Sequence, residues 1–232
     1  MEEDTLRVTI SHWLDHEFFT LTGEANPALP ATEGVADLLE QYDAVLKEHG
    51  LSLQNAVRGR LWGKDRESWR EGGRRRFEYL SGEARAASSS YISPRHFDST
   101  ASAGFDLFAM RPNNAAARKA ITDYDTPTNV MRFMKYDGVV IFSGHTHEHG
   151  ELNEQLDVIL GHLSDWLKEA GTGWGKVQRM SCFLRRDVSL DDLKQGIQRV
   201  LGADVPSPAE YMLVDDFSTP GKLVEIELIA LQ

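Results

Sequence analysis

The chain has 232 residues, 41% of them hydrophobic and 26% charged, a composition typical of a soluble globular protein with one large or two small domains. Its net charge of −11 argues against a broad nucleic-acid surface, which needs cations to displace phosphate counterions. The longest apolar run, 139–142, is too short to span a membrane, and the acidic first residues lack the pattern of a secretion signal. Because Cys182 is the only cysteine, no disulfide forms within the chain, and we expect a cytoplasmic protein.

In chain order, the first half predicts two strands, a helix, a strand, a second helix and two closing strands. The first helix is long and amphipathic, and a glycine ends it. The expected strands lie over 5–11, 18–22, 56–62 and 105–110, with a further strand before the last one, and the expected helices over 32–50 and 67–80.

The second half predicts the same order of elements. Its first helix carries apolar residues at helical spacing and also ends at a glycine. Strands are expected over 130–135, 139–143, 177–184 and 223–231, with a further strand before the last one, and helices over 152–171 and 190–201.

The two halves are related by a constant offset of 121 residues, as from 18 to 139. FFTLTGEA in the first half falls on VVIFSGHT in the second, VLKEHG on WLKEAG, and FDLFAM on IELIAL. The sequence therefore predicts two α+β domains of one fold, 1–111 and 129–232, joined by a linker at 112–128. Each has the order β-β-α-β-α-β-β, as a sheet with both helices on one face. We expect Gly23 to superpose on Gly144, and Ala109 on Ala230.

Three histidines alternate with other residues in GVVIFSGHTHEHGE, which covers 138–151. His145, His147 and His149 face one side if the chain there is extended, an arrangement that can hold a metal. The alternative is the polar end of a strand that turns into a loop. The equivalent turn of the first half, TGEANP, has Glu24 at the place of His145, so we interpret the turn as architectural. A segment this short rarely directs three imidazoles at one tetrahedral centre, and we expect no metal.

Four segments of the second half form a characteristic set: FSGH after the second strand, LKEAG at the end of the helix, KVQRMSCFLRR, and STPGKLVEIELIAL at the end. With them the chain resembles the RidA/YjgF imine-deaminase family over 138–231, and the offset extends the resemblance to the first half. The resemblance implies tandem chorismate-mutase-like domains and no cofactor. Single-domain members of the family form trimers, and tandem relatives include the chorismatases.

The resemblance also implies site residues. The family's water-activating glutamate corresponds to Glu225. The arginine that binds the substrate carboxylate corresponds to Glu210, and a carboxylate there repels a carboxylate. The first half has Gly104 and Ser89 at these two positions, so we expect its equivalent site to be inactive.

The other site residues are chosen by their place beside Glu225. Alternation puts Glu225 and Glu227 on one face of the last strand. This face is either an ordinary solvated sheet surface or, if the resemblance holds, the face that carries the catalytic glutamate. His145, directly after the Ser-Gly turn, is expected to line the cleft and assist proton transfer. Cys182 is expected to be a core residue. The expected substrate-binding residues are Glu210, Gly144, Met212 and His149.

Taken together, these residues predict a cofactor-independent hydrolase or deaminase of a small imine, enamine or related C–N compound. The alternatives are an enol-ether hydrolase of the chorismatase type and a ligand-binding module without catalysis. The expected partners are a small-molecule substrate and further copies of the chain, as a trimer before a dimer, with no nucleic acid and no membrane.

Overall fold

A computed structural model describes residues 6–126 and 128–232 of the chain, and its residues form two compact units that divide between Lys119 and Ala120. The stretch expected to be a linker, 112–128, therefore contributes to both units. It contains a short strand, β6 (Ala120–Asp123), that pairs within the second unit. Thr5 begins the first expected strand and lies outside the described residues.

The first unit follows the expected order of elements. Its long helix is amphipathic, and the buried face includes Leu38, Leu39 and Tyr42. Asp65 caps the second helix by accepting a hydrogen bond from the backbone N–H of Ser68 at 2.8 Å. The elements are β1 (Arg7–Trp13), β2 (His16–Glu24), α1 (Ala31–Glu48), β3 (Ala56–Gly63), α2 (Arg66–Tyr79), β4 (Ala87–Ile92) and β5 (Ala103–Arg111).

The second unit repeats the order after β6. Ser189 caps its second helix by accepting from the N–H of Asp192. The elements are β7 (Met131–Tyr136), β8 (Val139–Phe142), β9 (His145–Thr146), α3 (Leu152–Glu169), β10 (Val177–Arg185), α4 (Leu190–Leu201), β11 (Ala209–Val214) and β12 (Val224–Leu231).

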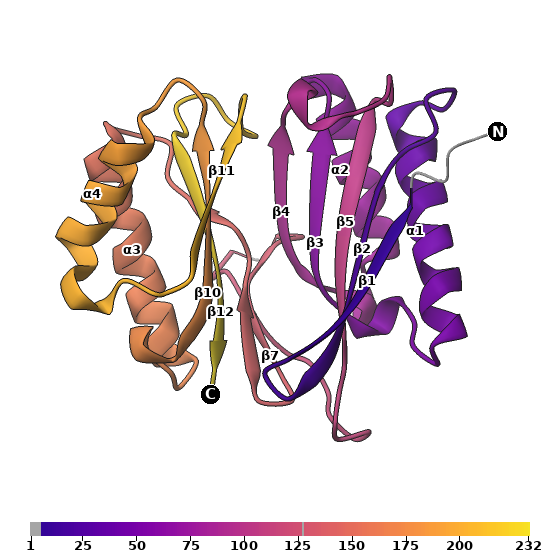
Figure 1. Ribbon diagram of the computed structural model, residues 1–232, viewed down its shortest axis with the longest axis horizontal. Helices are drawn as coiled ribbons and strands as arrows, with labels where there is room; N and C mark the ends of the chain where they lie inside the picture. The colour runs from indigo at the N-terminus through magenta and orange to yellow at the C-terminus, as the bar shows by residue number, and fades with distance from the viewer. Residues whose placement is uncertain (1–5, 127) are drawn as a thin grey trace. The chain divides into compact units, whose positions relative to one another are not determined.

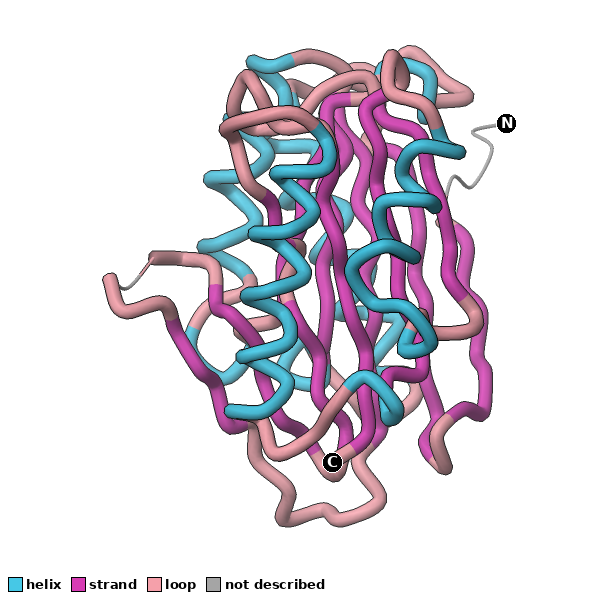
Figure 2. Tube along the Cα trace, turned by 90° about the vertical axis from the view of Figure 1, so that its left-hand side faces the viewer, coloured by secondary structure: helices cyan, strands magenta, loops and turns pink. Residues whose placement is uncertain are grey.

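Each unit is a sheet with both helices on one face (Figures 1 and 2). The first sheet has the order β1-β2-β5-β3-β4. The second has the equivalent order β7-β8-β12-β10-β11, with β6 added at the edge beside β7 and β9 paired with β12. In both units the strands on either side of the second helix, β3 with β4 and β10 with β11, are parallel. This is the α+β architecture that the sequence predicts.

The strand registers confirm the offset of 121 residues over most of each unit. Ala109 of β5 pairs with Phe19, and Ala230 of β12 pairs with Val140. The pairing of β5 with β3 corresponds to the pairing of β12 with β10, and both show an irregularity near the start of β3 or β10. Ala109 and Ala230 are therefore equivalent, as the sequence predicts.

The offset does not hold at two places. The opening hairpin is longer in the first unit, where Trp13 pairs with His16 across the turn. The second difference lies after β8. In the first unit Gly23 pairs with Phe105, but in the second unit Ile226, the equivalent of Phe105, pairs with His145 rather than with Gly144. The second unit has one additional residue in the strand at this point, a β-bulge.

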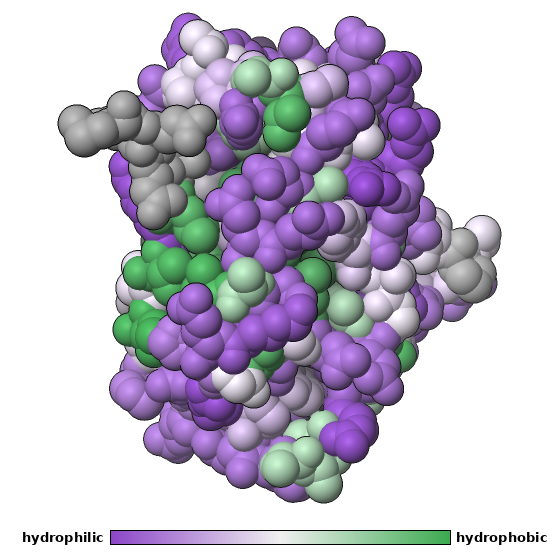
Figure 3. All heavy atoms as spheres, turned by 90° about the vertical axis from the view of Figure 1, so that its right-hand side faces the viewer, coloured by the Kyte–Doolittle hydropathy of each residue, from purple (hydrophilic) through white to green (hydrophobic). Residues whose placement is uncertain are grey.

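One face of the protein is mostly polar. Figure 3 shows one face on which hydrophilic atoms predominate and hydrophobic atoms gather in small patches. Among the described residues, the large hydrophobic side chains that are exposed are Val8, Ile10 and Leu213. Each unit has its own core between its helices and its sheet. No helix in the described part of the chain is long and apolar enough to cross a membrane.

Candidate functional site

Glu225 lies near the start of β12, and its carboxyl group packs directly on the backbone of Gly144. The residue is only 6% exposed. A methyl group added to Gly144 would lie 2.0 Å from Oε1 of Glu225 and 2.6 Å from its Cδ. The space for the carboxyl group therefore exists because position 144 has no side chain. Gly144 is thus the surface that receives the carboxyl group of Glu225, and a role for the two residues in a functional site stays a prediction.

The β-bulge explains why the local chain makes this space. β8 ends at Phe142 and β9 begins at His145, so the ladder with β12 is interrupted at Ser143 and Gly144. An interrupted ladder bends the strand and re-aims the side chains that follow it. In this unit Thr146, rather than His145, lies opposite Glu225.

Several side chains share the sheet face of Glu225, the face opposite the helices. On β12 the alternate residues Val224, Ile226 and Leu228 belong to the core beneath the helices, so Glu225 and Glu227 point to the other side. Both glutamates are buried, and Glu227 is fully so, which excludes the plain interpretation of a solvated face. Across the sheet, Phe183 pairs with Glu225, and Met212 of β11 pairs with Phe183.

A second row on the same face contains Glu210, Ser181 and Glu227, which are paired in that order across β11, β10 and β12. Glu210 accepts two hydrogen bonds on Oε1 from Arg179, at 3.0 and 2.7 Å, and one on Oε2 from the hydroxyl of Ser181 at 3.1 Å. The negative charge of Glu210 is thus compensated within the protein. We expected Glu210 to repel a substrate carboxylate, but that expectation did not include Arg179 on the neighbouring strand, which compensates the charge of Glu210.

His145 does not face Glu225. It lies opposite Ile226, whose side chain belongs to the core under the helices. Its Nε2 is 2.9 Å from Nδ1 of His162 on α3, and its ring centroid is 4.3 Å from that of Trp166. The structure therefore does not bring His145 and Glu225 together on one face, because the bulge turns His145 toward α3.

The buried position of His145 also determines its charge. Burial, together with the positive charges of His162, His147 and Lys222, lowers the pKa of His145 to about 3. A neutral imidazole at physiological pH is a hydrogen-bonding group and a packing surface. The structure therefore gives no support to a role of His145 in proton transfer.

The other two histidines of the alternating segment lie outside this core. The rings of His147 and His149 are 5.6 Å apart, and Nε2 of His149 lies 3.6 Å from Oε1 of Glu148. The side chain of His149 is 79% exposed. The three imidazoles therefore do not converge, because β9 contains only His145 and Thr146. Among the described residues, no group of three or more His, Cys, Asp or Glu side chains is placed to hold a metal ion.

Sequence reasoning did not consider Tyr124, whose phenol interacts electrostatically with Glu225. Burial raises the pKa of Tyr124 to about 12, and the charge of Glu225 acts in the same direction. Its ring lies edge-to-face with Trp166, with centroids 5.7 Å apart. Tyr124 follows β6 in the stretch expected to be a linker, so no signal in the sequence placed it near the last strand. Cys182, by contrast, lies in the core as expected, and burial raises the pKa of its thiol.

The equivalent place in the first unit is closely packed. Gly104 stands where Glu225 stands, and a methyl group on it would lie 3.2 Å from the backbone oxygen of Gly23 and 3.4 Å from the ring of Phe97. Trp62, the equivalent of Phe183, stacks on His96 with centroids 3.8 Å apart and donates a hydrogen bond to Asp106 at 2.8 Å. This face has no acid at the position of Glu225.

The loop that covers Gly104 is held by Glu24, which accepts hydrogen bonds from the backbone N–H groups of Asp98 and Ser99 at 2.6 and 3.0 Å. Burial acts to raise the pKa of Glu24, but the hydrogen bonds from Ser99 and Asp98 outweigh it and leave the pKa below its usual value. Glu24 is therefore a structural anion in the first unit.

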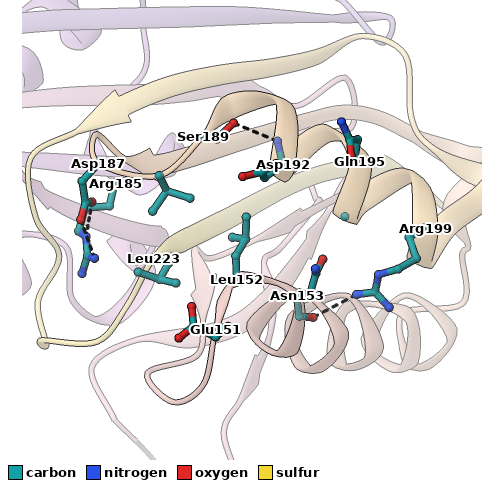
Figure 4. A pocket seen from close by; sticks show the side chains of 12 residues that line it. Glu151, Leu152, Asn153, Arg185, Asp187, Ser189, Asp192, Gln195, Arg199 and Leu223 are labelled. Carbon is teal, nitrogen blue, oxygen red and sulfur yellow. Dashed lines mark hydrogen bonds and ion pairs between the residues drawn. The ribbon is translucent and has the colours of Figure 1, made fainter.

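A groove of about 790 Å³ lies elsewhere in the second unit, between the N-terminal ends of α3 and α4 (Figure 4). Its two arginines are engaged with nearby groups. Arg185 donates to both carboxylate oxygens of Asp187, at 2.6 and 2.9 Å, and Arg199 donates to the backbone oxygen of Asn153 at 3.1 Å. None of the predicted site residues lines this groove.

Comparison with solved structures shows which fold the chain has. A chorismatase structure matches 98% of this chain and 78% of its own, with 15% identity and a TM-score of 0.66. A member of the YjgF family from Mycobacterium tuberculosis matches 49% of this chain and 99% of its own (19% identity, TM-score 0.44). A Rid-family protein of unknown function from Yersinia pestis matches 49% of this chain and 99% of its own, with 17% identity and a TM-score of 0.45.

No protein-family model matches the sequence, and no curated protein matches it either. At 15% identity, the likeness to the chorismatase shows the fold alone. It confirms the prediction of two tandem domains of the chorismate-mutase-like type, since the match extends over nearly the whole chain.

Proposed function

We propose that this protein hydrolyses a small unsaturated compound and that Glu225 is its general acid–base residue. The observation that carries the proposal is the buried carboxyl group of Glu225, seated on Gly144 at the bulge between β8 and β9. Burial disfavours the charged form of a carboxyl group, and a carboxyl group in such surroundings can both donate and accept a proton near neutral pH.

The favoured substrate is an imine or an enamine. Glu225 would give a proton to the nitrogen of the C=N bond, and a water molecule would add to the carbon. Glu225 would take a proton back from the added water and pass it to the nitrogen of the resulting carbinolamine. The C–N bond would then break while the hydroxyl proton returns to Glu225, so that imine and water become a carbonyl compound and ammonia. Each step needs only a positioned acid and water, and a single acid–base group typically contributes about 10²–10⁴ in rate.

The Arg179–Glu210 ion pair lies on the same face and is the candidate group for substrate binding. The side chains of the two residues are 33% and 37% exposed, so both are accessible to a ligand. A guanidinium with a carboxylate beside it presents both signs of charge, in contrast to a single arginine that binds one carboxylate. We therefore expect binding of substrates that do not depend on a free carboxylate. Met212 contributes an apolar contact on this face.

The test is a turnover screen with imines generated in situ, by an amine oxidase for imines without a carboxylate and by an amino-acid oxidase for 2-imino acids. The protein should speed the release of the carbonyl compound and reduce the imine that semicarbazide traps. Glu225→Gln keeps the size of the side chain and removes its acid, so turnover should fall at least a hundredfold while the thermal unfolding curve stays nearly unchanged. Full activity of Glu225→Gln on the true substrate would reject the assignment.

A second candidate is the hydrolysis of an enol ether. Two observations favour it: the likeness to a chorismatase over 98% of this chain, and the compensation of Glu210 by Arg179, which lessens the repulsion of an anionic substrate. Here Glu225 would protonate the double-bond carbon, water would add to the adjacent carbon, and the products would be a ketone and an alcohol. Parallel assays with imines and with enolpyruvyl ethers separate the two candidates. Binding without turnover in either assay would favour a ligand-binding module.

A further inference from the structure

Gln155 is a fully buried polar side chain that the proposed chemistry does not use. It lies in the first turn of α3 and is 0% exposed. Its Nε2 donates hydrogen bonds to the backbone oxygens of Gly150 and Gly221, at 3.0 and 2.8 Å. Its Oε1 accepts a hydrogen bond from the backbone N–H of Leu223 at 3.0 Å. Both amide hydrogens and the carbonyl oxygen are thus engaged with the backbone.

These three hydrogen bonds join two segments that are far apart in the sequence. One, 146–151, leads from β9 into α3, and the other, 218–223, leads into β12. The segments are in direct contact, because a methyl group on Gly221 would lie 2.4 Å from the backbone oxygen of Glu148. A fourth hydrogen bond runs from the hydroxyl of Thr146, in the first segment, to the backbone oxygen of Val224, the first residue of β12, at 2.9 Å.

Glu225 lies two residues after Leu223, near the start of β12. On the side of β10 the strand is paired from Val224 onward, and the backbone oxygen of Leu223 accepts a hydrogen bond from the N–H of Arg185 at 2.9 Å, but the ladder on the other side is incomplete. Toward β8, the strand is paired over 229–231, but the bulge interrupts the ladder, and only the two residue pairs with β9 follow. The bulge that makes room for the carboxyl group therefore removes part of the support beside it. Gln155 supplies fixed points on the backbone immediately before Glu225.

We propose that Gln155 is a positioning residue that fixes the start of β12 and thereby holds the carboxyl group of Glu225 over Gly144. The proposal rests on the proposed function of Glu225. A misplacement of about 1 Å at a reacting group can lower the rate by about 10², so a residue that fixes the backbone two positions away affects the chemistry without contacting the substrate.

Two variants of Gln155 test the proposal. Gln155→Met is similar in size and removes all three hydrogen bonds. Gln155→Glu, protonated in this buried place, keeps the acceptor for Leu223 and one donor, and serves as the conservative variant. The matched control is Gln198→Met on α4, which removes a 2.7 Å hydrogen bond from a glutamine to the backbone oxygen of Gly202, away from β12.

Three quantities are measured in each variant: the amide hydrogen-exchange rate of Leu223, the NMR signal of the ¹³C-labelled carboxyl group of Glu225, and kcat and KM. The Glu225 signal is assigned by its loss in Glu225→Gln. In Gln155→Met we expect at least tenfold faster exchange at Leu223, a displaced Glu225 signal, and kcat about 10–100-fold lower with KM within about twofold. Gln155→Glu should fall between Gln155→Met and the wild type, and Gln198→Met should match the wild type.

Faster exchange at Leu223 with an unchanged Glu225 signal would overturn the proposal, because Gln155 would then hold only the loop. If the wild type turns over none of the substrates, the proposed function fails, and the Glu225 signal still decides whether Gln155 positions the carboxyl group. If Gln155→Met does not fold, the same measurements on Gln155→Glu decide, with a wild-type Glu225 signal and kcat counting against the proposal.

Discussion

Gly144→Ala is the substitution that tests most directly how Glu225 is seated. The added Cβ would lie 2.0 Å from Oε1 of Glu225, whereas real Cβ atoms essentially never come within 3.0 Å of another heavy atom. The oxygen must therefore move by about 1 Å or more. The three nearest atoms all belong to the Glu225 side chain, so we expect the carboxyl group to move rather than the backbone. We expect turnover to fall about a hundredfold, and the free energy of unfolding to fall by about 1–3 kcal/mol.

The matched control is Gly161→Ala, in the middle of α3. A methyl group there has nothing within 4 Å, so the substitution should raise the free energy of unfolding by about 0.5–1 kcal/mol through helix propensity and leave turnover unchanged. Denaturant unfolding and turnover are measured on both variants.

A double-mutant cycle with Glu225→Ala separates the clash from other effects. If the methyl group introduced by Gly144→Ala acts by displacing the Glu225 carboxyl group, the substitution should destabilise the wild type but have little effect in the Glu225→Ala background. A penalty that persists there, or wild-type turnover of Gly144→Ala, would refute the seating of Glu225 on Gly144.

Three further predictions concern pH, charge and assembly. The folded-state pKa of His145, about 3, lies below its ordinary value of 6.5, so its contribution to stability is complete above pH 6.5 and is lost as the pH falls toward 3, by at most about 5 kcal/mol. In His145→Gln the free energy of unfolding should not show this decrease with falling pH, and an equal decrease would contradict the prediction. Glu210→Gln should lower KM for anionic substrates about fivefold, because Arg179 loses about 1 kcal/mol of interaction with a competing carboxylate. The control Asp187→Asn, which breaks the ion pair with Arg185, should leave KM unchanged. Light scattering should give a trimer of roughly 78 kDa, three chains of 26.1 kDa, and a 26 kDa particle at micromolar concentration would count against it.

The repeat made most of the fold predictable from the sequence. A constant offset requires the same elements in the same order, and the registers of Ala109 and Ala230 show that it also fixes strand pairing. Helix α3 was predictable because its apolar residues recur at helical spacing. Strand β6 was not predictable, because it has only four residues, is flanked by turn-forming residues, and is too short to show the alternation of a strand.

The candidate site was predictable only in part. Glu225 was found through the resemblance and the alternation of β12. The contacts of His145 depend on one additional residue in the strand before it, and a shift of one residue moves a side chain to the other face of the sheet. Sequence alternation contains no signal for such a shift. Arg179 and Glu210 meet because β10 and β11 are parallel neighbours in a particular register, which one sequence does not specify.

The bulge connects these observations. In the first unit β2 is continuous from His16 to Glu24, and the position opposite Glu24 is Gly104. In the second unit the strand is interrupted where the closing strand carries Glu225, and the interruption supplies the space beside Gly144. A continuous ladder and a buried carboxyl group at this place are therefore alternatives. Replacing Gly104 with a glutamate would not by itself create a second site, because β2 has no interruption to receive the side chain and a Cβ there would already lie 3.2 Å from the backbone oxygen of Gly23.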